Sequence, residues 1–137
     1  MLKLGASHQE NPLARILIID DEATIRRPLK IFLERAGHEV MDAANGSEAV
    51  RLWRQQAGDL VITDIHMPEK NGLEAIIELR QIAPRARFLA MSGGDMNARV
   101  DVLGDATLLG AVRTISKPFT LEEMLRAVEE VLGSGDA

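Results

Sequence analysis

The chain has 137 residues, 46% hydrophobic and 27% charged, which suits one globular domain with a single core. Its 16 Lys and Arg against 21 Asp and Glu leave a net charge of -5, so no basic surface is expected to bind nucleic acid directly. Cysteine is absent, which excludes disulfides and thiol catalysis and suits a reducing compartment.

Both ends of the chain differ from its middle. Residues 1–14 show neither a helical nor a strand period, so we predict a disordered leader there. Residues 133–137 are expected to form a flexible tail, which assigns residues 15–132 to the domain. The leader has no apolar run long enough for a secretory signal, and no later stretch approaches a membrane span. We therefore expect a cytoplasmic protein without a membrane partner.

Short apolar runs alternate with amphipathic stretches from Arg15 onward, as strands and helices do in α/β proteins. The predicted strands are Arg15–Ile19, His38–Ala43, Leu60–Thr63, Arg87–Met91 and Val112–Ser116. Gly37 and the Asn45-Gly46 pair mark places where a helix must stop or a turn needs a positive φ. This alternation implies right-handed crossovers, and therefore a doubly wound, five-stranded parallel sheet with helices on both faces.

Amphipathic helices are expected between the strands and after the last one. Residues that share one face of a predicted helix are Ile25, Leu29, Leu33 and Ala36; Ala49, Val50 and Trp53; Leu73, Ile76, Ile77 and Leu79; and Leu121, Met124, Leu125, Val128, Val131 and Leu132. Pro28 should kink the first helix, because it removes a hydrogen bond to the Thr24 carbonyl. Thr120 and Glu123 form a capping box at the start of the last helix. Asn97–Leu109 has a weak apolar period, which predicts a short or mobile helix.

Polar residues stand at the carboxyl ends of four predicted strands, where open parallel sheets bind ligands. They are Asp20 and Asp21, Asp64, Ser92 and Lys117. Clustered carboxylates do not all stay ionised without a compensating cation, and oxygen-only ligands favour Mg²⁺ or Mn²⁺. A carboxylate between a hard cation and the Lys117 ammonium stays nucleophilic, and both cations stabilise an incoming phosphoryl group. The expected product is an aspartyl phosphate on Asp64, with Ser92 donating to a phosphoryl oxygen.

Each of these residues has a simpler interpretation when taken alone. Asp20 and Asp21 can cap a helix, and Asp64 can start a turn. Ser92 with its two following glycines can be an ordinary loop, and Lys117 a solvated lysine. The joint hypothesis depends on coincidence, because independent caps and turns would not terminate four different strands at one edge of a sheet.

The quoted residues also resemble a known family, the response-regulator receiver domains of bacterial two-component systems, including the chemotaxis regulator. The matching motifs are Asp20-Asp21, Asp64-Ile65-His66-Met67-Pro68 with Gly72, Ser92-Gly93 and Lys117-Pro118-Phe119. The resemblance spans Arg15 to about Leu132 and implies the strand order 2-1-3-4-5. It also implies a signalling switch that catalyses only its own phosphorylation and dephosphorylation.

The resemblance assigns a role to each motif. Asp64 would accept a phosphoryl group from a histidine kinase or a histidine phosphotransfer protein, and the domain would then alter its contact with an unknown downstream protein. Mg²⁺ would be bound by Asp21, Asp64 and the backbone carbonyl of His66, with Asp20 acting through water. Ser92 and Lys117 would turn toward the phosphoryl oxygens.

One position departs from the family pattern. The family couples the movement of the serine to an aromatic side chain three positions before the lysine, and Thr114 stands there. A ring cannot act as the switch, so the readout would follow another route, or the chain would be a fixed interaction module. The side chain of His66, two residues after Asp64, is a candidate for tuning phosphoryl lifetime.

Two other functions fit the same fold less well. A haloacid-dehalogenase-type phosphatase needs a second acid two residues after its nucleophile, where this chain has His66. A flavodoxin-like binder needs a hydroxyl-rich phosphate loop after the first strand and aromatic residues around the flavin, but the chain has three Phe, one Trp and no Tyr. No output domain follows the last predicted helix, which suggests either a stand-alone receiver or a fragment of a longer regulator.

Overall fold

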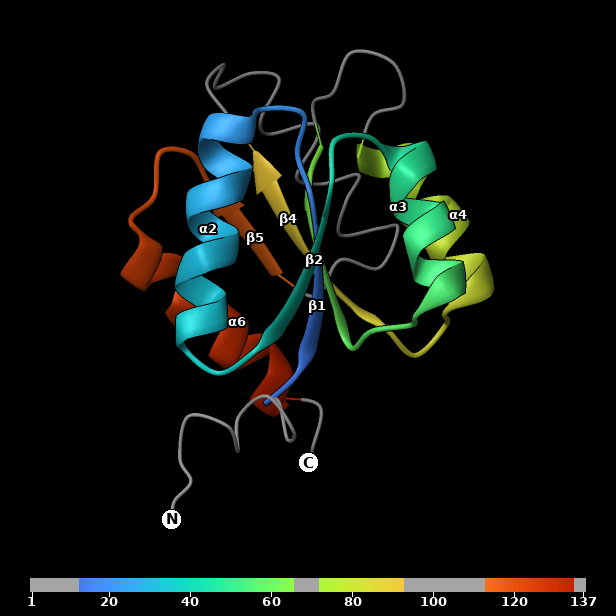
Figure 1. The fold of residues 1–137 in the computed structure, drawn as a ribbon. Helices are drawn as coiled ribbons and strands as arrows, with labels where there is room; N and C mark the ends of the chain where they lie inside the picture. The colour runs from blue at the N-terminus through green and yellow to red at the C-terminus, as the bar shows by residue number, and fades with distance from the viewer. Residues whose placement is uncertain (1–12, 66–71, 93–112, 135–137) are drawn as a thin grey trace.

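The computed structural model describes residues 13–65, 72–92 and 113–134, and it shows a parallel sheet with helices on both sides (Figure 1). The strands are β1 (Arg15–Ile19), β2 (Glu39–Ala43), β3 (Leu60–Asp64), β4 (Arg87–Ser92) and β5 (Arg113–Ser116). They pair in the order β2-β1-β3-β4-β5, and every pairing is parallel. The helices are α2 (Ala23–Arg35), α3 (Gly46–Gln55), α4 (Gly72–Ile82) and α6 (Leu121–Ser134). The predicted doubly wound fold and its strand order are confirmed.

The sheet divides the hydrophobic core into two clusters, because alternate strand residues face opposite sides. The cluster under α3 and α4 includes Leu17, Ile19, Val61, Phe88, Trp53 and Leu79. The cluster under α2 and α6 includes Ile16, Ile18, Ile62, Leu89, Leu33 and Val128. All five residues of β3 are buried, as expected for a central strand covered on both faces.

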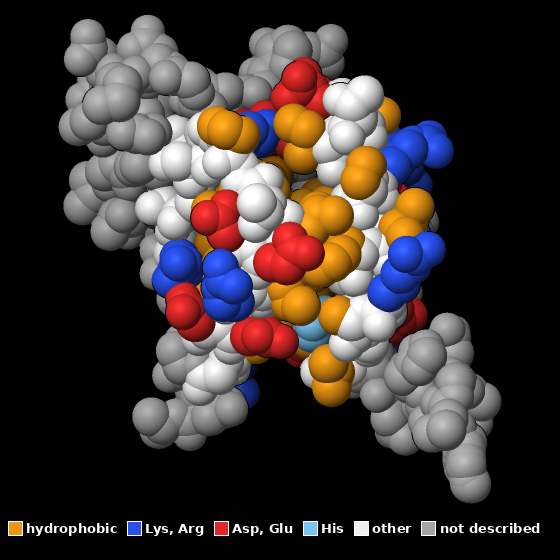
Figure 2. All heavy atoms as spheres, turned by 90° about the vertical axis from the view of Figure 1, so that its left-hand side faces the viewer, with side chains coloured by type: hydrophobic (Ala, Val, Ile, Leu, Met, Phe, Trp, Pro, Cys, Tyr) orange, Lys and Arg blue, Asp and Glu red, His pale blue; other side chains and the backbone are white. Residues whose placement is uncertain are grey.

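The face that carries α2 and α6 is amphipathic. Figure 2 shows hydrophobic side chains near the middle of this face, with Lys and Arg side chains on either side. The partly buried residues that border the cluster beneath it are Phe32, Ile115, Phe119, Leu121, Leu125 and Leu132. Among the described residues, no helix is both long and apolar enough to cross a membrane.

Local signals in the sequence set most helix boundaries. Gly37 has φ +107° just after α2, as predicted for a residue that stops a helix. The Asn45-Gly46 pair differs from its prediction, because Asn45 is extended and accepts a hydrogen bond from the Glu48 backbone N–H at 2.8 Å. It therefore caps α3 instead of forming a positive-φ turn. Thr120 and Glu123 exchange both hydrogen bonds of the predicted capping box.

Several predicted boundaries move by one residue. His38 precedes β2 instead of starting it, whereas β3 extends to Asp64 and β4 to Ser92. These last two side chains therefore project from residues that are still paired in the sheet. Pro28 lies within the assigned span of α2, and the kink predicted there stays a prediction.

Other predictions concern the parts of the chain outside the described residues. These parts include the predicted helix Asn97–Leu109, the predicted first residue of the fifth strand, Val112, and His66.

The leader predicted for residues 1–14 is partly described. Ala14 is buried, and the Leu13 backbone N–H donates to the Gly37 carbonyl at 3.1 Å. The leader and the tail themselves stay predictions.

Candidate functional site

Three carboxylates meet at the carboxyl ends of β1 and β3. Asp20 and Asp21 follow β1, Asp64 is the last residue of β3, and the two strands are direct neighbours in the sheet. Ligand oxygens of the three residues all lie within 4.8 Å of one another. Asp20 and Asp64 are buried, whereas Asp21 is exposed. The structure thus brings the predicted acids into one pocket that is open on the side of Asp21.

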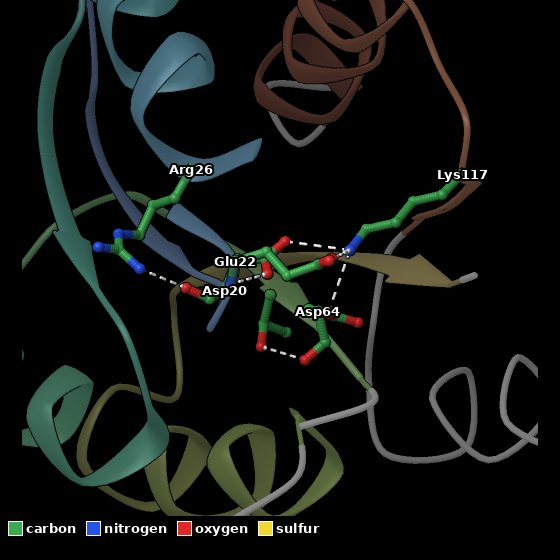
Figure 3. A network of polar contacts seen from close by, with 6 residues as sticks. Asp20, Glu22, Arg26, Asp64 and Lys117 are labelled. Atoms are coloured by element: carbon green, nitrogen blue, oxygen red, sulfur yellow. Dashed lines mark hydrogen bonds and ion pairs between the residues drawn. The ribbon is translucent and has the colours of Figure 1, made fainter. Parts of the chain in front are cut away.

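Lys117 compensates the two buried acids (Figure 3). Its Nζ lies 3.1 Å from Asp20 Oδ2 and 3.1 Å from Asp64 Oδ2, and its side chain is only 16% exposed. Burial alone would lower the pKa of Lys117, but the carboxylates of Asp64 and Asp20 outweigh it and raise the pKa above its usual value. The ammonium therefore remains protonated at neutral pH.

Asp20 is held in place from several directions. Its Oδ1 accepts a hydrogen bond from the Glu22 backbone N–H at 2.9 Å, and its own backbone N–H donates to the Ala43 carbonyl at 3.1 Å. Burial raises the pKa of Asp20 above its usual value, although the Glu22 N–H and Lys117 act in the opposite direction. The N-cap of α2 is Glu22, with no side-chain capping bond. The helix-cap interpretation of Asp20 and Asp21 is therefore not supported.

Ser92 contributes a buried hydroxyl group. It is the last residue of β4, it is fully buried, and its Oγ makes no hydrogen bond with the residues that the structure describes. Its backbone is fixed, because its carbonyl accepts a 2.6 Å bond from the Lys117 N–H. A buried hydroxyl without a partner costs about 1–3 kcal/mol, so such groups are usually explained by a missing ligand or by a functional role.

The donor set fits a hard divalent cation. Three carboxylates whose oxygens lie this close are the ligands that Mg²⁺ and Mn²⁺ prefer, and within the described part of the chain no nitrogen or sulfur ligand joins the cluster. One ammonium group cannot neutralise three acids. With three ionised carboxylates and one ammonium, the site carries a net charge of about -2, which a divalent cation would neutralise.

Sequence reasoning missed two side chains that border this pocket. Arg26 donates from Nη1 to the Asp20 carbonyl at 2.7 Å and from Nε to Asp42 Oδ2 at 2.8 Å. Glu22 places Oε1 3.5 Å from Lys117 Nζ. Glu22 directly follows the Asp20-Asp21 pair and Arg26 lies near the start of the next helix, which is the available sequence signal. Their partners come from β2 and from the segment after β5, so the contacts depend on the strand order.

Two further positions, His66 and Thr114, were singled out by the sequence. His66 lies outside the described residues, so its carbonyl and side chain stay predictions. Thr114 is partly buried on β5, where it pairs in register with Ala90 of β4.

The chain is similar to proteins of one family over most of its length. The family model described as "Response regulator receiver domain" matches residues 16–129. The chemotaxis protein CheY of Thermotoga maritima is 39% identical over 118 residues, which cover 85% of this chain and 96% of that protein. The transcriptional regulator NtrC of Azospirillum brasilense is 40% identical over 124 residues, but the match spans only 24% of that longer protein and 88% of this chain.

A solved structure agrees with this similarity. The CheY-like receiver domain protein of Methanospirillum hungatei superimposes with a TM-score of 0.82 at 27% identity, covering 89% of this chain and 95% of that one. It shares the five-stranded parallel architecture of the sheet described above.

Proposed function

Because the chain belongs to the response regulator receiver domain family, the signalling modules of two-component systems, we propose that it is a phosphoacceptor switch whose acceptor is Asp64. The observation that carries this proposal is the meeting of Asp20, Asp21, Asp64 and Lys117 in one pocket. We assign the receiver to residues 15–132, between a leader and a tail.

Asp64 is the nucleophile in this proposal. One carboxylate oxygen of Asp64 attacks the phosphorus of a phosphohistidine, the P–N bond breaks, and the imidazole leaves with the bonding electron pair. Lys117, whose Nζ lies 3.1 Å from Asp64 Oδ2, offsets the charge of this carboxylate before the transfer and then contacts a phosphoryl oxygen. Ser92 supplies its unpartnered hydroxyl to another phosphoryl oxygen, which would satisfy the buried donor.

Asp21 and Asp64 would hold Mg²⁺ or Mn²⁺ directly, Asp20 would act through water, and the His66 carbonyl would complete the protein ligands. The ion supplies positive charge that offsets the acids and the phosphoryl oxygens. In this arrangement the domain catalyses its own phosphorylation and dephosphorylation and no other reaction.

The proposed partners follow from the family. The phosphodonor is a histidine kinase or a histidine phosphotransfer protein, and the output is an altered contact with a downstream protein. Relatives such as NtrC are DNA-binding regulators four times as long as the shared segment, so DNA binding there need not involve this domain. Because the chain has a net charge of -5, we propose that it makes no direct contact with nucleic acid.

Intact-protein mass measurement tests the proposal. Treatment with acetyl phosphate and Mg²⁺ should add one phosphoryl group to the wild type, and chelation of the metal should prevent it. The Asp64→Asn variant should stay unmodified. Asp59→Asn is a matched control, because Asp59 accepts a bond from the Arg15 N–H at the opposite end of the strands. An unmodified wild type at saturating donor would favour the inert interaction module.

A further inference from the structure

Glu22 is an acidic side chain at the mouth of the pocket that the proposed chemistry does not use. Its Oε1 lies 3.5 Å from Lys117 Nζ, and its side chain is 56% exposed, whereas those of Asp20 and Asp64 are 0% and 4% exposed. Figure 3 shows Glu22 reaching across the pocket toward the same ammonium that Asp20 and Asp64 contact. Glu22 is therefore a solvent-exposed acid that shares its cation with the two buried acids.

Among the described residues, the Glu22 side chain makes one ion pair, with Lys117. It is the N-cap residue of α2, but its side chain makes no capping hydrogen bond. Its backbone N–H donates to Asp20, and this contact does not depend on the side chain. At 3.5 Å, with the Glu22 carboxylate 56% exposed to solvent, this ion pair is expected to contribute little to stability. Changing the side chain should thus leave the fold intact and alter mainly the charge at the pocket.

That charge matters for an approaching phosphodonor. Asp20, Asp21, Glu22 and Asp64 carry four negative charges at full ionisation, against one positive charge on Lys117, because the charge of the nearby Arg26 is offset by Asp42. A divalent cation would still leave the pocket one charge negative. Because Glu22 Oε1 and Asp64 Oδ2 lie 3.5 Å and 3.1 Å from the same ammonium nitrogen, a phosphoryl group at Asp64 is close enough to be repelled by the Glu22 carboxylate.

We propose that Glu22 is a specificity-determining residue, which slows phosphorylation of Asp64 by small, free, dianionic donors such as acyl phosphates. This inference rests on the proposed function. In the disfavoured reaction an Asp64 oxygen bonds to phosphorus, the P–O bond to the acyl group breaks, and the carboxylate leaves with the electron pair. Repulsion from Glu22 raises the barrier of this encounter in proportion to the donor's charge.

The test compares donors of different charge. Phosphorylation rate constants are measured by intact mass for the wild type, Glu22→Gln and Glu22→Lys, with acetyl phosphate as the dianionic donor and phosphoramidate as the less charged one. Mg²⁺ is kept saturating for each variant, as determined by titration. Glu34→Gln is the matched control, because it removes an acid of the same helix that pairs with Lys30 in the last turns.

We expect Glu22→Gln to speed phosphorylation by acetyl phosphate about three- to tenfold at low salt, with a larger gain for Glu22→Lys. The gain should be smaller for phosphoramidate, and it should shrink at high salt because screening weakens repulsion between exposed charges. Glu34→Gln should match the wild type.

The two ideas fail in different ways. If Asp64 is phosphorylated at the same rate in all Glu22 variants, or if the gain ignores donor charge and salt, the role of Glu22 is wrong while the receiver function stands. If no variant, the wild type included, accepts a phosphoryl group from either donor, the proposed function itself is wrong and the role of Glu22 falls with it.

Discussion

Lys117 stabilises two carboxylates that have lost almost all contact with water. A buried pair is costly to break from one side, because the remaining charges keep their desolvation penalty and lose their compensation. Asp20 and Asp64 both lie 3.1 Å from this ammonium. The stability of the metal-free domain should therefore depend on this one side chain.

Replacing Lys117 by Met tests this dependence. Without divalent metal, we expect the free energy of unfolding to fall by about 3 kcal/mol, and added Mg²⁺ should recover part of the loss. Urea denaturation with and without a chelator measures both effects. Lys30→Met, which removes a surface pair in α2, should cost less than about 1 kcal/mol. Equal losses in both variants would contradict compensation in the pocket.

His38 predicts a pH dependence of stability. It is buried, and neither ring nitrogen has a hydrogen-bond partner among the residues at 13–65, 72–92 and 113–134. Burial lowers the pKa of His38 below its usual 6.5, although the nearby Glu129 acts in the opposite direction. The folded state thus binds a proton less readily than the unfolded state, so this contribution is complete above pH 6.5 and is lost as the pH falls toward the folded-state pKa.

The His38→Gln variant should lose less unfolding free energy than the wild type when the pH is lowered from above 6.5 to below it. Comparing the two proteins at each pH cancels the contributions of other groups such as Asp20. His8→Gln, in the predicted leader, should keep the wild-type profile. An unchanged profile in His38→Gln would show that His38 does not carry the effect.

At the scale of helices and strands, one side chain of α2 makes hydrogen bonds to β2 and to the loop after β1. Arg26 of α2 donates to the carbonyl after β1 and to Asp42 of β2, and its side chain is only 11% exposed. This arginine anchors the loop that carries Asp20 and Asp21. The orientation of these acids should therefore depend on a residue that contacts no phosphoryl group.

We predict that Arg26→Gln lowers the free energy of unfolding by about 1–3 kcal/mol and weakens Mg²⁺ binding. Urea denaturation and calorimetric Mg²⁺ titration measure the two effects separately. The neighbouring Arg27 is exposed, so Arg27→Gln is the control and should change neither quantity much. Unaltered Mg²⁺ affinity in Arg26→Gln would mean that the loop keeps its shape without this anchor.

The helices and strands also show which features could be predicted from the sequence. Alternating apolar runs and capping residues predicted the bounds of β1 to β4, the end of β5 and the start of α6 to within one residue, because these signals are local. Asn45 was misjudged, since the same Asn-Gly pair suits a turn or a helix cap. Asp20, Asp64 and Lys117 were found because strand ends meet at one edge of a parallel sheet. The contacts of Glu22 and Arg26 depend on which strands are neighbours, and local pattern does not contain that information.

At the scale of the whole molecule, one sheet supports both hydrophobic clusters. Residues of β1 alternate between them, with Leu17 and Ile19 on one side and Ile16 and Ile18 on the other. Loss of packing on either face removes support from the shared strands. The two sides of the described fold should therefore unfold together.

One substitution on each face tests this cooperativity. Leu33→Ala under α2 and Phe88→Ala on the opposite face should each cost about 2–5 kcal/mol, because both side chains are fully buried. Trp53 fluorescence reports on one face and far-UV circular dichroism on all elements, and their transitions should coincide in both variants. Ile31→Ala, at an exposed position, should have little effect. Separate transitions in Leu33→Ala would show that the faces unfold independently.

The acceptor pocket draws its charged groups from the ends of β1 and β3 and from the segment just after β5, stretches of chain that meet only once the sheet has assembled. A truncated or misfolded copy of the chain therefore has an aspartate at position 64 without the neighbouring acids and the lysine. We expect such a copy to lack the phosphoacceptor reactivity proposed for the folded domain.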